Sequence, residues 1–115
     1  MYKRQDHDGA GKRYEAALPL YQKVGAVLGE ANCIQSLGDI EEQKGEIEAA
    51  RERWREALAL YGRIPEPYSI GCTHLRLARR ATTPEVAAEH REAARKAWTS
   101  IGRQDLIETH LGKGE

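Results

Sequence analysis

The stretch AARERWREALALYGRI at residues 49–64 decides the fold, because much of it recurs twice elsewhere in the chain. A shift of forty residues places residues 10–24 on residues 50–64 with six identities. These are Ala10, Arg13, Ala17, Leu18, Leu20 and Tyr21, each with its equivalent forty residues later. A shift of forty-four places EAARERW (48–54) on EAARKAW (92–98), with five of seven residues identical. Self-similarity at such periods predicts a repeat architecture, in which three copies of one helix alternate with less similar helices.

Length and composition restrict the chain to one helical domain. It has 115 residues, 18 basic and 18 acidic side chains, a pI near 6.9 and no phenylalanine. A net charge of zero provides no global field for nucleic acid or anionic lipid. No apolar run approaches the ~20 residues of a membrane span, and the first residues lack the apolar stretch of a secretory signal. We expect a cytoplasmic protein with neither nucleic-acid nor membrane partners.

Glycine and proline predict where the helices end. Gly45 and the pair Pro65 and Pro67 separate helical patterns. Thr83 followed by Pro84 is typical of a helix N-terminus, where the hydroxyl accepts a free backbone N–H. The helices are expected at residues 10–28, 30–44, 47–63, 68–80, 84–101 and 103–111, and Pro19 predicts a first helix that is bent or starts late.

The repeated residues resemble the tetratricopeptide repeats, in their longer, kinesin-light-chain-like form of about forty residues. The motif of this family is a leucine and a small residue in the first helix of a pair, then alanine, aromatic and alanine in the second. One unit matches it with Leu37, Gly38, Ala50, Trp54 and Ala57. The next matches with Leu77, Ala78, Ala94 and Trp98, and departs from the motif at Ile101. Tyr14 and Ala17 carry only the second half of an earlier unit.

The resemblance implies an all-α fold, a short right-handed solenoid of antiparallel helix pairs. Its parts are a half repeat at 10–28, full repeats at 30–64 and 68–101, and a C-terminal cap and tail at 103–115. We expect Gly38 and Ala78 to let paired helices approach closely, and Trp54 and Trp98 to fill gaps between neighbouring pairs. A plain up-and-down bundle is the alternative, although it does not require small residues to recur with this period.

Catalytic and metal-binding patterns are weak, so neither an enzyme nor a cofactor is expected. The segment DGAGKR (8–13) lacks the glycine spacing and the Ser or Thr of a phosphate loop. His90 has Ala94 where a helical zinc pair needs a second histidine, and His74 and His110 are isolated in the sequence. Cys33 and Cys72 have no neighbouring base that predicts a nucleophile.

In the family that the chain resembles, the first helices of successive pairs line a concave groove. The resemblance therefore implies a partner-binding groove with amides and carboxylates on one wall and arginines on the other. Its residues are Asn32, Gln35, Asp39 and Glu42 on the first wall, and Cys72, Leu75, Arg76 and Arg79 on the second. The alternative role of Arg76 and Arg79 is to stabilise the C-terminal end of their helix.

The predicted function is a non-catalytic interaction module that binds a protein or peptide in this groove. The alternative is a regulatory segment of a larger signalling or transcription-regulating protein, which senses a peptide or another effector. A further expectation concerns Tyr14, Leu18 and Tyr21, whose helix lacks the first helix of its repeat. An uncovered apolar face of this kind favours self-association as a homodimer.

Overall fold

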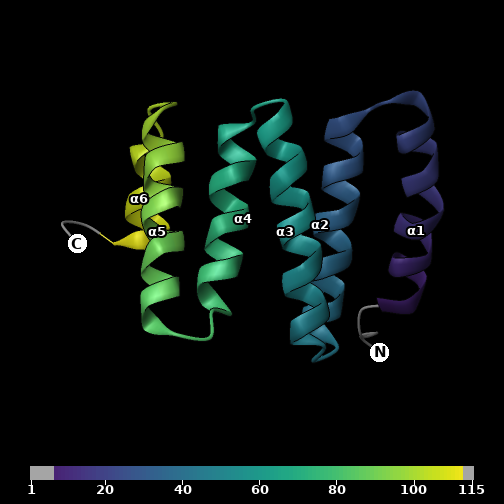
Figure 1. The fold of residues 1–115 in the computed structure, drawn as a ribbon, viewed down its shortest axis with the longest axis horizontal. Helices are drawn as coiled ribbons and strands as arrows, with labels where there is room; N and C mark the ends of the chain where they lie inside the picture. The colour runs from purple at the N-terminus through teal and green to yellow at the C-terminus, as the bar shows by residue number, and fades with distance from the viewer. Residues whose placement is uncertain (1–6, 113–115) are drawn as a thin grey trace, which may run out of the picture. The chain divides into compact units, whose positions relative to one another are not determined.

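The computed structural model describes residues 7–112, and within this range the protein is all-α, as predicted (Figure 1). Six helices follow one another: α1 His7–Val24, α2 Val27–Gln43, α3 Ile47–Arg63, α4 Pro67–Arg79, α5 Pro84–Thr99 and α6 Gln104–Leu111. The chain divides into two compact units, residues 1–57 and residues 58–115. Residues 113–115 of the predicted tail lie outside the described residues.

In the first unit, α1 corrects two expectations. The helix begins at His7, so it does not start late, and it continues through Pro19. It ends at Val24 rather than at residue 28, because Gly25 adopts a φ of 73° and the N–H of Ala26 returns to the carbonyl of Tyr21 at 2.9 Å. Positive φ is accessible to glycine at little cost, so the chain turns here. Gly29, where a break was expected, lies inside α2.

The α2–α3 hairpin turns at Gly45, as predicted. Gly45 has a φ of 87°, and the N–H of Glu46 bonds to the carbonyl of Glu41 at 2.8 Å. Inside the hairpin, the fully buried indole of Trp54 lies over Gly38, where an added Cβ would approach Nε1 to 2.7 Å. The small residue thus makes room for the tryptophan of the paired helix.

In the second unit, side chains cap both helices of the α4–α5 hairpin. A carboxylate oxygen of Glu66 accepts the N–H of Ser69 at 3.0 Å at the start of α4. The hydroxyl of Thr83 accepts the N–H of Val86 at 3.1 Å at the start of α5, which confirms the predicted N-terminus. Each helix has proline in its first turn, where its missing N–H removes no helical bond.

Trp98 of α5 corrects the predicted packing. Its fully buried indole lies over Gly71 of α4, where an added Cβ would stand 2.2 Å from Nε1. Each tryptophan therefore packs over a glycine of the other helix of its own pair, in addition to the predicted packing in gaps between pairs, and Trp98 also packs against α6. The small residue beneath Trp98 is Gly71 and not Ala78, because α5 places its tryptophan near the start of α4. Ile107 of α6 joins Trp98 in the core of this unit.

Candidate functional site

The α2 wall of the predicted groove is only partly available to a ligand. Asn32 is exposed, while Gln35, Asp39 and Glu42 are partly buried. The carboxylate of Asp39 accepts the indole N–H of Trp54 at 3.0 Å, so it holds the α2–α3 hairpin together. This role was not anticipated, since the sequence analysis assigned Asp39 to ligand contact alone.

The α4 wall has Cys72, Leu75 and Arg76 partly buried and Arg79 exposed. Both arginines lie in the last turn of α4, as predicted. The guanidinium of Arg76 donates to the carbonyl of Cys72 at 3.2 Å, and so is used within its own helix. Arg79 forms no ion pair with the residues that the structure describes. Because α2 and α4 belong to different units, their union in one groove stays a prediction.

Both cysteine thiols are shielded. Burial raises the pKa of Cys33 and that of Cys72, which disfavours the thiolate that nucleophilic chemistry needs. Beside Cys72, the pKa of Tyr68 is raised mainly by the negative charge that the thiolate would carry. The guanidinium of Arg103 stacks 5.9 Å from the centre of the Tyr68 ring and pairs with Asp105 at 2.9 Å. The pair of Arg103 and Asp105 lies at the start of α6.

His74 is isolated in the sequence and His90 has no second histidine one turn away, but the structure brings these two side chains together. Their Nδ1 atoms are 2.9 Å apart and their ring centres 5.2 Å apart. Burial, followed by the charge of His90, lowers the pKa of His74 from 6.5 to about 4. His74 is therefore a neutral imidazole at neutral pH.

The geometry of this pair fits a shared proton better than a shared metal ion. The ring centres are 5.2 Å apart and the two Nδ1 atoms are 2.9 Å apart. The difference between these distances is about twice the distance from the centre of an imidazole to one of its ring atoms. Each Nδ1 therefore points directly at the other. A linear N–H···N hydrogen bond has this form, whereas metal ligands converge on a third point between them. Over residues 7–112, no three His, Cys, Asp or Glu side chains form a group that could hold a metal ion.

The apolar face of α1 is partly covered by the next helix. The ring of Tyr21 lies over Gly29 of α2, where an added Cβ would come within 2.5 Å of it. Tyr14 and Leu18 are partly buried, and the most exposed large apolar residue is their neighbour Leu20, at 66%. Tyr21 nevertheless stays exposed, at 39%. Self-association through α1 stays a prediction.

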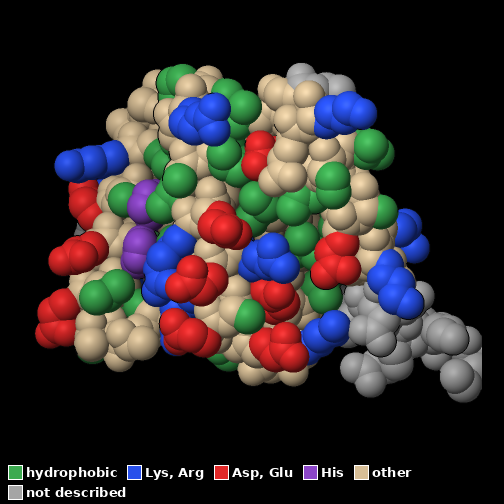
Figure 2. All heavy atoms as spheres, turned by 45° about the vertical axis from the view of Figure 1, so that its right-hand side comes forward, with side chains coloured by type: hydrophobic (Ala, Val, Ile, Leu, Met, Phe, Trp, Pro, Cys, Tyr) green, Lys and Arg blue, Asp and Glu red, His purple; other side chains and the backbone are tan. Residues whose placement is uncertain are grey.

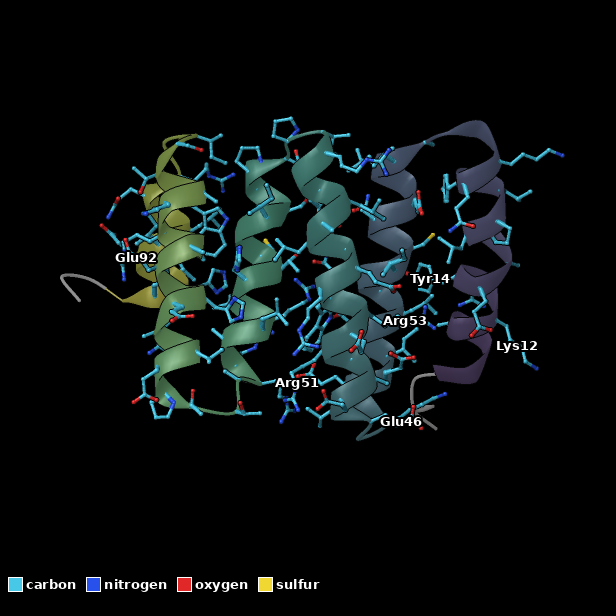
Figure 3. All side chains as sticks on the ribbon, viewed as in Figure 1. Lys12, Tyr14, Glu46, Arg51, Arg53 and Glu92 are labelled. Atoms are coloured by element: carbon cyan, nitrogen blue, oxygen red, sulfur yellow. The ribbon has the colours of Figure 1, made fainter. Side chains whose placement is uncertain are left out.

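The charged residues of α3 pair with one another along the helix. Glu48 pairs with Arg51, and Glu52 pairs with Arg55 at 3.6 Å, on the same helix. Arg51 and Arg53 lie on opposite sides of α3 (Figure 3), and Arg53 reaches Glu41 of α2 at 3.4 Å. Acidic and basic side chains alternate over the face drawn in Figure 2, with no large area of one sign. Exposed pairs of this kind contribute only a few tenths of a kcal/mol.

Comparison with protein-family models, with curated proteins and with solved structures finds no match. None of the helices within residues 7–112 has both the length and the apolar character needed to cross a bilayer.

Proposed function

We propose that the chain is a non-catalytic interaction module, similar to a tetratricopeptide solenoid, which binds a peptide through the polar faces of α2 and α4. Two antiparallel hairpins, each with a tryptophan over a glycine, support the repeat interpretation. The peptide is extended or helical and carries carboxylates where it meets α4. On α2 it meets the exposed amide of Asn32.

The observation that carries this proposal is the exposed guanidinium of Arg79. It has no ionic partner among the described residues, although the arginines of α3 described above pair with glutamates. An arginine without an internal partner can form two parallel hydrogen bonds to a carboxylate of a ligand. Recognition at this position therefore selects acidic residues.

The test is selection of peptides from a random library on the immobilised protein, followed by calorimetric titration of the enriched sequences. We expect enrichment of Asp and Glu. Reversal of charge in Arg79→Glu should weaken binding about three- to tenfold, by loss of one attraction and gain of one repulsion. Arg91→Glu is the matched control, because Arg91 is an exposed arginine of α5, outside the proposed surface.

Equal losses in Arg79→Glu and Arg91→Glu would contradict the proposal, since they would indicate binding by net charge alone. A library that yields no enriched sequence would contradict it as well. Circular dichroism of each variant establishes that the helices are retained.

A further inference from the structure

The contact between His74 and His90 has a chemistry that peptide binding does not use. His74 lies on α4 and His90 on α5, so their Nδ1 atoms join the two helices of one hairpin over 2.9 Å. Both side chains are partly buried. A proton on one Nδ1 completes a hydrogen bond to the other, whereas two cationic rings place two Nδ1–H groups and two positive charges against each other.

We propose that the His74–His90 pair is an acid-sensitive contact, which closes the α4–α5 hairpin around one shared proton and opens it when both rings become cationic. The hydrogen bond survives the first added proton, because a charged His90 still donates to a neutral His74. It does not survive the second, which leaves no acceptor on either ring.

The residues one turn away from each histidine on its own helix carry no charge. One turn away along α4 lie Ile70, Gly71, Leu77 and Ala78, and one turn away along α5 lie Val86, Ala87, Ala93 and Ala94. All of these are apolar or small. The helices of this unit carry further titratable or charged groups: Arg63 of α3, Arg76 and Arg79 of α4, Glu85, Glu89, Arg91, Glu92, Arg95 and Lys96 of α5, and Asp105, Glu108 and His110 of α6. Among the described groups, however, only His90 contributes its charge to the pKa shift of His74.

The direction of the pH dependence follows from the two states of His74. Its pKa is 6.5 when the chain is unfolded and about 4 in the folded protein, so the unfolded chain binds more protons between these values. The contribution to stability is complete above pH 6.5 and is lost as the pH falls towards 4. A full shift of this size changes the folding equilibrium by more than a hundredfold, and partial exposure of the ring reduces this to about tenfold to a hundredfold.

The shared proton can be tested directly by NMR on the wild-type protein labelled with ¹⁵N. We expect scalar coupling between the Nδ1 nuclei of His74 and His90 at pH 7, which only an N–H···N hydrogen bond transmits. His74 should titrate well below the 6.5 of an ordinary histidine, at about 4. Amides of α4 and α5 should lose protection from hydrogen exchange below pH 5 more than those of α2, after correction for intrinsic rates.

His74→Gln tests the consequence for stability, because the glutamine amide can still donate to His90 but does not titrate. We expect the urea midpoint of the wild type to fall between pH 7 and pH 5, and that of His74→Gln to fall clearly less. His110→Gln is the matched control and should behave like the wild type. EDTA in every sample excludes a contribution from bound metal ions.

Absence of the coupling at pH 7, with His74 titrating near 6.5, would overturn the proposal without reference to any variant. The same pH dependence in His74→Gln and in the wild type would overturn it too. These measurements are separate from peptide binding, so they can succeed or fail whatever the outcome for Arg79.

Discussion

Gly71→Ala is expected to destabilise the second unit, although alanine is the better helix former by about 1 kcal/mol. The new Cβ would stand 2.2 Å from Nε1 and 2.5 Å from Cε2 of Trp98, which are contacts that the indole can relieve only by moving. The ring is fully buried, and its Nε1 donates to the carbonyl of Tyr68 at 3.2 Å. Movement therefore disturbs both the packing and this hydrogen bond.

The two losses set the magnitude. Overpacking of a core costs about 1–3 kcal/mol, and a buried donor left without its acceptor costs about 1–3 kcal/mol. After subtraction of the gain in helix propensity, the free energy of unfolding should fall by about 1–5 kcal/mol. The loss is smaller if the indole keeps its bond while it shifts.

Gly62→Ala is the matched control, since an added Cβ there meets nothing within 4 Å. Gly62 is exposed and lies near the end of α3, so we expect a gain of a few tenths of a kcal/mol at most. Urea unfolding followed by circular dichroism measures both variants. If Gly71→Ala is as stable as Gly62→Ala, the assigned packing of Trp98 on α4 is wrong. In a Trp98→Phe background the cost of Gly71→Ala should shrink by about 1 kcal/mol or more, because the two positions are in contact.

Three further substitutions test other contacts by the same unfolding measurement. Asp39→Ala leaves the buried N–H of Trp54 without its acceptor and should lower the free energy of unfolding by about 1–3 kcal/mol. Asp39→Asn keeps an acceptor oxygen and should lower it less. Equal losses in the two variants would show that the hydrogen bond is unimportant. Ala94→Leu should cost about 1–3 kcal/mol because Ala94 is fully buried, and wild-type stability would refute its place in the core. Thr83→Ala removes the cap of α5 and should cost about 1 kcal/mol, whereas Thr82→Ala, one residue earlier and exposed, should cost little; the reverse order would misplace the cap.

The helix boundaries show what a single sequence can establish. Gly45 and Thr83 were assigned correctly because each stands alone between two strong helical patterns. Gly25 and Gly29 compete within five residues, and nothing in their local sequence says which one turns the chain. The structure separates them by a long-range contact: a side chain at residue 29 would meet the ring of Tyr21. That information lies in the packing of α1 on α2 and not in either segment alone.

The histidine pair was missed for a related reason, although a signal for it exists in the sequence. In an antiparallel hairpin with a short turn, residues at similar distances from the turn lie opposite each other. His74 precedes the end of α4 at Arg79 by five residues, and His90 follows the start of α5 at Pro84 by six. Predicting which residues of α4 and α5 lie opposite each other would have identified the contact between the two rings. A search for ligand spacing along one helix does not identify it. The role of Asp39 needs the same step, since its partner Trp54 lies across a turn.

The tryptophans provide each unit with an optical reporter of its own. Trp54 belongs to residues 1–57 and Trp98 to residues 58–115, and both indoles are fully excluded from water. Among the described residues, the imidazole of His110 lies beside Trp98, with 5.7 Å between the ring centres. Fluorescence of Trp54→Phe and Trp98→Phe therefore follows the two halves of the protein one at a time, through unfolding and through the binding of a peptide.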